Sequence, residues 1–298
     1  MDGLEFYRAF YNLNSRINNI LNTISNISFQ PNSLTDANDP FIERFSRRVG
    51  YLKVHRPDYL DATRFSNVHS LEFYDFLSQQ QLAQVRHEYF AHLVYLRMCY
   101  IEDSCIASAF FQMIFSNGFP SLYKCVLDEL TPPEPNHRWL SSPSLHSLII
   151  GGFALPVYSF ILISCSNLTH LHWSTMRYTD ADIDTVPVRH THLKCLYIRT
   201  INIRKIETIL LHVPNLKRLH IVSDWSRGNN CLPLDFKQLA RILVRCVPYL
   251  YRFDCETMQR DPIDIDVIHG YHPCFRRIQF ERVPDGRTRF FTIEQRNL

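Results

Sequence analysis

Glycine is scarce in this chain, with 8 residues among 298. The sequence also lacks the G-x-x-x-x-G-K-[ST] phosphate loop, the H-E-x-x-H zinc motif and the G-x-S-x-G nucleophile motif. No C-x-x-C pair occurs among its nine cysteines. These absences argue against collagen-like chains, Gly-rich linkers and glycine-loop nucleotide sites, and they leave no familiar catalytic motif.

The cysteines are dispersed and odd in number, and the first 21 residues are polar and amphipathic rather than a basic stub before an apolar core. We therefore expect reduced thiols and a cytoplasmic or nuclear location. The net charge of +3 is too small to argue for nucleic acid, and we expect no nucleic-acid partner.

One phrase recurs along the chain: an apolar residue, two variable residues, an apolar residue, one variable residue and an apolar residue. Most successive copies start roughly 20–29 residues apart, which is the period of a leucine-rich repeat. The phrase predicts an α/β leucine-rich-repeat solenoid, with a curved parallel sheet on its concave side and short helices on its convex side. The ten copies start at Val49, Val68, Leu93, Leu122, Leu145, Leu168, Leu193, Leu216, Leu250 and Phe275.

Several segments between the phrases have apolar residues at helical spacing. We expect convex-side helices over Ser78–Phe90, Ile106–Phe115, Ile203–Val213 and Phe236–Val247. Polar loops at 131–135 and 223–230 follow expected strands, and each is either a contact element or a structural insertion.

The run Ser147–Asn167 contains no charged residue. A membrane-spanning helix needs about 20 apolar residues, but two glycines and Pro156 interrupt this run. Leu148 and Ile150 also fit the repeated phrase. We expect a buried strand–turn–helix unit here, and no membrane partner.

The N-terminal stretch differs from the repeats. Apolar residues at 6, 10, 13, 17, 20 and 21 have helical spacing. We therefore divide the chain into a helical segment at 1–28, a linker at 29–46, about ten repeats over 47–281, and a C-terminal tail at 282–298.

The phrase Leu13-Asn14-Ser15-Arg16, followed by apolar Ile17, Ile20 and Leu21, resembles the closing part of an F-box. An F-box followed by irregular repeats resembles the F-box/leucine-rich-repeat family. That resemblance implies a substrate receptor of a cullin–RING ubiquitin ligase, in which the F-box docks on a Skp-type adaptor and the repeats hold the substrate. The adaptor-binding residues would be Phe10, Leu13, Asn14, Arg16 and Ile17.

The opening leucine–proline–x–glutamate phrase of an F-box is absent before this stretch. We therefore keep two expectations open. Either the chain is a fragment or truncated form, or the helix caps the exposed end of the solenoid.

In each phrase, the three residues that flank the last two apolar positions point away from the core, because side chains alternate along a strand. Their charge is mixed overall, unlike a phosphate-tracking groove. Tyrosine and arginine are enriched at protein interfaces. We therefore predict a protein-binding concave face, on which the residues from His170 to His220 meet an acidic or aromatic segment; the alternative is an ordinary solvated sheet face. The predicted contact residues are Tyr95, Arg97, His170, His172, Tyr197, Arg199, Arg218, His220 and Arg252.

Metal binding is the main chemical alternative for this face. His170 and His172 share one strand face, with Cys195 and His220 on following repeats. Structural zinc sites use tighter cysteine and histidine clusters, so we expect no metal.

Two further patterns contain residue types that could carry chemistry. His190 and His192 are expected to be a solvated loop pair, and Asp180, Asp182 and Asp184 lack the glycine and closing glutamate of a calcium loop. Cysteines at phrase positions fit as small core residues. We expect no catalysis and no cofactor. Two functions remain: a ubiquitin-ligase substrate receptor, or a free-standing leucine-rich-repeat interaction or inhibitor protein.

Overall fold

The computed structural model describes residues 3–11, 13–24, 26–31, 42–55, 61–75, 82–99, 104–127, 130, 139–152, 155–174, 188–199, 203–222, 234–257, 264–283 and 288–292. The chain divides into two compact units, Met1–Leu148 (unit 1) and Ile149–Leu298 (unit 2). Each unit is a mixed α/β structure built on mostly parallel strands. The boundary falls within one strand, β6 (Ser147–Ile150).

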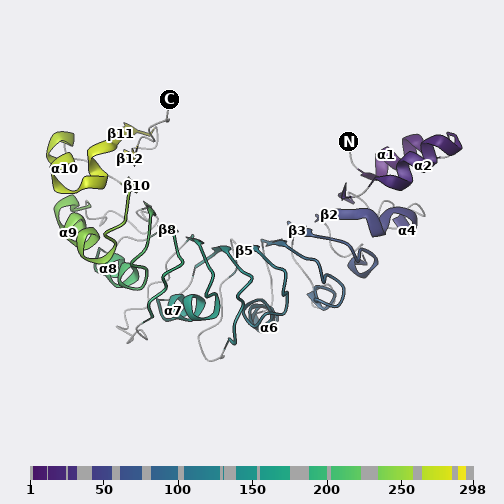
Figure 1. The fold of residues 1–298 in the computed structure, drawn as a ribbon, viewed down its shortest axis with the longest axis horizontal. Helices are drawn as coiled ribbons and strands as arrows, with labels where there is room; N and C mark the ends of the chain where they lie inside the picture. The colour runs from purple at the N-terminus through teal and green to yellow at the C-terminus, as the bar shows by residue number, and fades with distance from the viewer. Residues whose placement is uncertain are drawn as a thin grey trace. The chain divides into compact units, whose positions relative to one another are not determined.

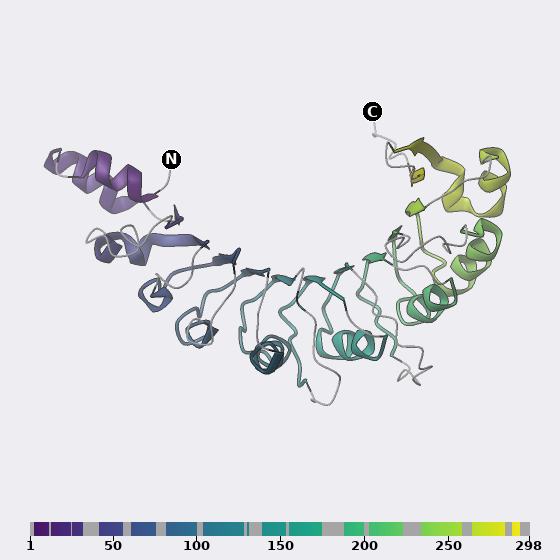
Figure 2. The ribbon, with the colours of Figure 1, turned by 180° about the vertical axis from the view of Figure 1, so that it is seen from behind.

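The strands of unit 1 pair in chain order, and every pair is parallel. α6 lies on one side of the neighbouring strands (Figure 2). The strands are β1 (Ile27–Phe29), β2 (Val49–Val54), β3 (Ser70–Phe73), β4 (Tyr95–Met98) and β5 (Lys124–Leu127). The helices are α1 (Gly3–Phe10), α2 (Ser15–Thr23), α4 (Ile42–Phe45) and α6 (Ser104–Phe115), with 3₁₀ turns η1 (Ser46–Arg48) and η3 (Ala62–Arg64).

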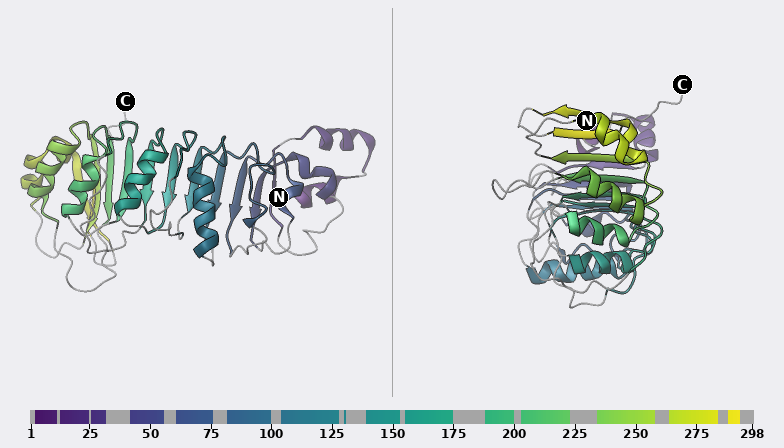
Figure 3. Two further views of the ribbon diagram at one scale, coloured as in Figure 1. Left: turned by 90° about the horizontal axis from the view of Figure 1, so that it is seen from below. Right: turned by 90° about the vertical axis from the view of Figure 1, so that its left-hand side faces the viewer.

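Unit 2 begins with four parallel strands and ends with an antiparallel pair. The strands are β7 (His170–Trp173), β8 (Cys195–Arg199), β9 (Arg218–Val222), β10 (Arg252–Thr257), β11 (Ile278–Arg282) and β12 (Thr288–Thr292). β12 lies between β10 and β11 and runs antiparallel to both. The helices lie along one side of these strands (Figures 1 and 3); they are α7 (Leu155–Ser164), α8 (Ile203–Leu211), α9 (Phe236–Cys246) and α10 (Ile265–Tyr271), followed by the 3₁₀ turn η4 (Pro273–Arg277).

The repeated phrase sets the strand register. In unit 2 the second apolar residue of each phrase pairs with its counterpart, so Leu171, Leu196, Leu219 and Phe253 form one row. All four are buried, with exposed fractions of 2% or less. Burial of such a row removes apolar surface from water at every repeat, and slipping one strand by a residue would expose its whole apolar set.

A recurring turn precedes each strand. The backbone N–H of the first apolar residue of the phrase bonds back three residues, as in Leu122 to the Phe119 carbonyl at 3.0 Å and Leu216 to the Val213 carbonyl at 3.1 Å. The residue that begins this turn is buried in every copy, which closes the core between helix and strand. These residues are Ser46, Phe65, Phe90, Phe119, Ser142, Cys165, His190, Val213, Val247 and His272.

His190 departs from the turn pattern by using its side chain. Its Nδ1 accepts the backbone N–H of Leu193 at 3.1 Å, and its Nε2 lies 2.9 Å from the Cys165 carbonyl. The expectation of a solvated pair is therefore wrong for His190, which is 5% exposed; His192 is exposed as predicted. The reason is position, because His190 begins the turn before its strand and that place is part of the core.

The structure corrects the expected end of the repeats. The tenth phrase contributes β11, but this strand does not pair with β10 in parallel as predicted. Residues Thr288–Thr292, within the expected C-terminal tail, form β12 and occupy that position. Its alternating apolar residue Phe290 is fully buried and packs 4.8 Å from the ring of Phe236 on α9.

The structure also corrects two predictions for helices in unit 1. The single N-terminal helix is broken, because the Asn14 side chain accepts the Ile17 N–H at 2.9 Å and starts a new helix. The helix predicted over Ser78–Phe90 is wrong for residues 83–90, which form turns that still bury Val85, whereas residue 82 is helical and 78–81 lie outside the described residues.

The strand–turn–helix prediction for Ser147–Asn167 is confirmed by β6 and α7. α7 has 10 residues, and no helix within the described ranges is both long and apolar enough to cross a membrane.

Candidate functional site

The face of the unit 2 sheet that points away from the helices carries most of the predicted contact residues. On β8, Leu196 and Ile198 are buried while Cys195, Tyr197 and Arg199 are partly exposed. This alternation is what the phrase predicts. We call the outward residues of β7–β10 the unit 2 face, comprising His170, His172, Cys195, Tyr197, Arg199, Arg218, His220, Arg252, Asp254 and Glu256.

Three rings form a row across this face. Strand register places His172 beside Tyr197 and Tyr197 beside His220. Their ring centroids are 3.8 and 4.6 Å apart, so the rings are in contact on three neighbouring strands. The row gives the face a rigid, amphipathic centre of the kind found at interface hot spots.

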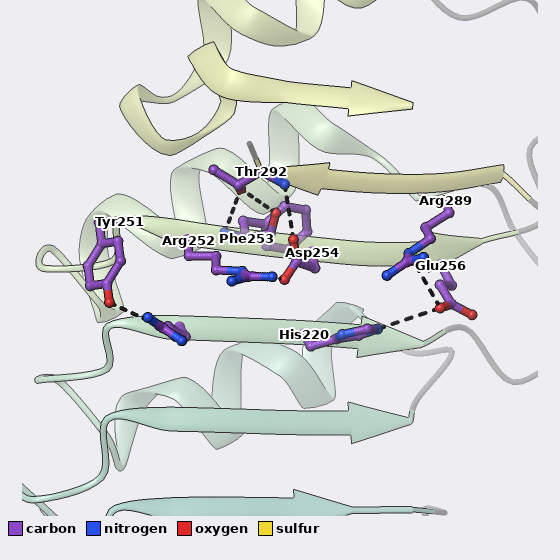
Figure 4. A network of polar contacts seen from close by, with 9 residues as sticks. His220, Tyr251, Arg252, Phe253, Asp254, Glu256, Arg289 and Thr292 are labelled. Atoms are coloured by element: carbon purple, nitrogen blue, oxygen red, sulfur yellow. Dashed lines mark hydrogen bonds and ion pairs between the residues drawn. The ribbon is translucent and has the colours of Figure 1, made fainter. Parts of the chain in front are cut away.

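His220 is held mostly neutral. Burial lowers its pKa, and this effect outweighs the opposing influence of Asp254 and Glu256. Its Nε2 lies 3.9 Å from a Glu256 carboxylate oxygen (Figure 4). The ring therefore contributes hydrogen-bonding and stacking capacity to the face near neutral pH, with little positive charge.

Arg252 and Asp254 form the best-defined ion pair of the face, with Nε 2.8 Å from the carboxylate (Figure 4). The other Asp254 oxygen accepts the backbone N–H of Thr292 at 3.0 Å. The hydroxyl of Thr292 also donates to the Phe253 carbonyl at 2.7 Å. Arg252 was predicted as a contact residue, and the structure commits its guanidinium to the junction between β10 and β12.

Sequence reasoning missed Arg289, because it lies on the unexpected strand β12. Its guanidinium lies 3.3 Å from a Glu281 oxygen and 3.9 Å from a Glu256 oxygen. It thus bridges carboxylates from β11 and β10 on the open side of the sheet. The only signal in the sequence was the alternation of residues 288–292, which follows no repeated phrase.

Arg218 stands at the start of β9, where it is exposed. Its Nε donates to the hydroxyl of Tyr251 at 3.0 Å. Burial lowers the pKa of His170, and the Arg218 charge lowers it further. Arg199 stands at the other end of the face, opposite Val222 in the register of β8 and β9.

Tyr95 and Arg97 lie on the outward face of unit 1, in a separate cluster around Glu72. Glu72 is 7% exposed and accepts a hydrogen bond from the Tyr74 hydroxyl. That bond and burial raise the pKa of Tyr74, while burial raises the pKa of Tyr95 to about 12. Arg97 lies 5.1 Å from the Tyr74 ring centre, so the cluster combines a buried carboxylate with cation–π contacts.

Lysines complete this cluster on both sides. Lys53 Nζ lies 4.5 Å from the Tyr74 ring centre and Lys124 Nζ lies 5.3 Å from that of Tyr95. His55 stacks on Tyr74 at 4.8 Å. Glu72, Tyr74 and both lysines were placed on the outward face by the phrase, but their mutual contacts were not foreseen.

The residues predicted to bind an adaptor lie on α1, α2 and the turn between them. Phe10 and Leu13 are 37% and 59% exposed, and Ile20, beyond the predicted set, is 55% exposed. Arg16 is exposed and Ile17 is half-buried. Asn14 is exposed, and its side-chain oxygen accepts the Ile17 N–H as the cap of α2.

Histidine and cysteine side chains were the candidates for a metal site or a nucleophile. No group of three or more His, Cys, Asp or Glu residues within the described ranges could hold a metal ion. Cys274 contacts a histidine, with its Sγ 2.8 Å from Nδ1 of His272. Burial raises the pKa of this thiol to about 12 and lowers that of His272, which disfavours the thiolate that a nucleophile requires. The two polar loops and the Asp180–Asp184 stretch lie outside the described residues.

The chain matches no protein-family model, and no curated protein matches it.

Proposed function

We propose that this chain is a protein-binding leucine-rich-repeat scaffold and the substrate-recognition part of a cullin–RING ubiquitin ligase. The observation that carries the proposal is the unit 2 face, where in-register strands present the ring row of His172, Tyr197 and His220 beside arginines. Aromatic and arginine side chains are enriched at protein interfaces. A curved solenoid would present such a face as an extended binding surface.

The N-terminal helices support the adaptor role implied by the F-box resemblance. Phe10, Leu13 and Ile20 are large apolar side chains that lie exposed on α1, α2 and the intervening turn. Exposed apolar clusters commonly mark interaction sites. We assign these residues to a Skp-type adaptor.

A free-standing interaction or inhibitor protein is the second candidate, and one packing detail favours it. Leu4 and Leu21 are buried at 2% and 1% exposure, and Arg48 donates to the Leu21 carbonyl at 2.8 Å. The two helices are thus anchored on unit 1, as expected for a cap that covers the end of a repeat array.

Calorimetric titration of the purified chain with a purified Skp-type adaptor separates the two candidates. We expect binding by the wild type and at least about tenfold weaker binding by Leu13→Asp, because a charge would be buried at the contact. Leu140→Asp is the matched control, since Leu140 is an exposed leucine elsewhere in unit 1 and should leave binding unchanged. Absence of binding by the wild type would favour the free-standing protein.

The thiols are consistent with action in the cytoplasm or nucleus. None of the cysteines that the structure describes forms a disulfide. Stable disulfides are characteristic of oxidising compartments, so their absence from this part of the chain agrees with the proposed location.

A further inference from the structure

The ends at which β7–β10 begin form a continuous edge. The Thr169 carbonyl accepts the Lys194 N–H at 2.9 Å, and the Lys194 carbonyl accepts the Lys217 N–H at 2.9 Å. The Lys217 carbonyl in turn accepts the Tyr251 N–H at 3.1 Å. These bonds place successive turn and strand-start segments side by side. We call this edge, together with the segment before β11 that lies beyond β12, the strand-start rim. It is made of residues 164–170, 188–195, 211–218, 244–252 and 269–277.

The rim contains no aspartate or glutamate in any of its five segments. Its Lys and Arg residues are Arg189, Lys194, Lys217, Arg218, Arg245, Arg252, Arg276 and Arg277. Most of these side chains are exposed, including Lys217 and Arg276. The acidic residues described in unit 2 lie in other segments, at Glu207, Asp235, Asp254, Glu256, Asp264, Asp266 and Glu281.

Part of this charge is compensated within the protein. Arg245 pairs with Glu207, and Arg252 pairs with Asp254. The charge of Arg218 still acts on its neighbours in the rim. Burial lowers the pKa of His170 and the Arg218 charge lowers it further, while burial raises the pKa of Cys195 and the Arg218 charge opposes that rise.

The fold itself does not require a basic rim. The matching segments of unit 1, at 45–51, 64–70, 89–95, 116–124 and 141–147, contain only Arg47, Arg48, Arg64 and Lys124 as Lys or Arg residues. Of these, Arg64 pairs with Glu43 at 3.2 Å. The strand-start rim of unit 2 therefore carries eight Lys or Arg residues against four in the matching segments of unit 1. This excess of positive charge points to a negatively charged ligand.

The aromatic residues of the rim favour a polypeptide as that ligand. Tyr249 and Tyr251 are 67% and 53% exposed. The guanidinium of Arg218 lies 5.8 Å from the Tyr251 ring centre, and its Nε donates a hydrogen bond to the tyrosine hydroxyl, which orients it. A stacked nucleic-acid base would compete with that guanidinium for the ring, whereas a carboxylate would meet a guanidinium already held in place.

We propose that the strand-start rim of unit 2 binds an acidic segment of a partner protein, through Lys194, Lys217 and Arg218. This inference names the chemistry of the partner in the proposed function. It rests on that function only because it assumes that the partner is a protein. Neighbouring strands lie about 4.8 Å apart, and an extended chain advances about 3.3 Å per residue. About five residues would therefore cross the starts of β7–β10, and a segment rich in Asp or Glu would place several carboxylates along them.

Fluorescence anisotropy with a labelled Glu-rich peptide of about ten residues tests the proposal, since that length exceeds the rim. We expect binding at low ionic strength, little binding of the Gln-for-Glu peptide, and weakening by salt. The double variant Lys194→Glu/Lys217→Glu should bind at least about tenfold more weakly. Lys237→Glu/Arg241→Glu on α9 makes the same change in net charge at exposed positions outside the rim, and should bind within about twofold of the wild type.

Equal losses in the two double variants would overturn the proposal, because the attraction would then come from net charge alone. Circular dichroism first checks that the rim variant is folded. If it is not, the single variant Lys217→Gln takes its place, and a smaller loss of peptide binding is then expected. Tighter binding of oligouridylate or anionic vesicles than of the peptide, abolished by the rim variant, would also overturn it. The assay contains no adaptor, so failure of the ubiquitin-ligase role leaves its result interpretable.

Discussion

Asp254 on β10 accepts the backbone N–H of Thr292 on β12 at 3.0 Å, across 38 residues of sequence. Its second carboxylate oxygen is bonded to Arg252 at 2.8 Å. One buried side chain therefore joins the antiparallel end of unit 2 to its parallel strands. The same side chain holds Arg252 in an ion pair.

Replacing Asp254 should weaken this junction. We expect Asp254→Ala to lower the free energy of unfolding by about 2–4 kcal/mol, because it leaves a buried N–H and the Arg252 charge without their acceptor. Asp254→Asn should cost less, since its amide oxygen can still accept the Thr292 N–H. Urea denaturation followed by circular dichroism measures both, with exposed Glu281→Gln as the control. Equal stabilities for Asp254→Ala and Glu281→Gln would show that the junction carries no stability.

The strand predictions succeeded for the first nine copies of the repeated phrase. The tenth copy forms β11, but its predicted parallel pairing with β10 is wrong because β12 lies between them. Burial of the three apolar residues of each phrase fixes the register between neighbouring parallel strands. β2–β10 therefore lie where the phrase places them. β12 carries no such phrase and is recognisable only through its pairing with distant residues. The Asn14 cap that divides the N-terminal helix is a short polar signal within an otherwise continuous apolar pattern.

The sequence predicted on which side of the sheet the candidate site lies, but not which of its charged residues form ion pairs. Alternation along each strand placed Tyr197, Arg218 and Asp254 on the outward side. Which cation meets which carboxylate depends on side-chain conformations and on Arg289, whose strand was not foreseen. The ion pair between Arg252 and Asp254 could therefore be identified only from the structure.

Stability should fall with acid because His190 is buried. Burial lowers its pKa below the ordinary value of about 6.5, so below that pH the unfolded chain binds a proton that the folded chain does not. Stability is then fully present above about pH 6.5 and is lost as the pH falls, by up to about 1.4 kcal/mol per pH unit for this one proton.

The variant His190→Gln should flatten this pH dependence, since glutamine does not titrate. The exposed neighbour His192 supplies the control variant His192→Gln, which should retain the wild-type slope. Chemical denaturation at several pH values gives the slopes. A wild-type slope in His190→Gln would contradict the assignment, and His170, His220 and His272, whose pKa values are also lowered, would then account for the acid sensitivity.

Glu72 and Tyr74 should be energetically coupled in unit 1. The carboxylate is buried and accepts the phenol hydrogen, and a hydrogen bond to a charged group contributes about 1.5–3 kcal/mol. A double-mutant cycle with Glu72→Gln and Tyr74→Phe should give a coupling energy above about 1 kcal/mol. Pairing Glu72→Gln with Tyr123→Phe, at an exposed tyrosine on the edge of the same sheet, should give additive effects. Additivity in both cycles would mean that the Glu72–Tyr74 bond contributes nothing.

The central claim is that the unit 2 face recognises a protein, and quantitative mass spectrometry of tagged chain recovered from cells tests it most directly. We predict that at least one protein recovered with the wild type is lost from Tyr197→Ala/Arg218→Ala and kept by Lys237→Ala/Arg241→Ala, which alters exposed positions on α9. A Skp-type adaptor should be recovered equally with all three, because its proposed contacts lie on α1, α2 and the turn between them. Identical recovery of every protein by both double variants would contradict the claim.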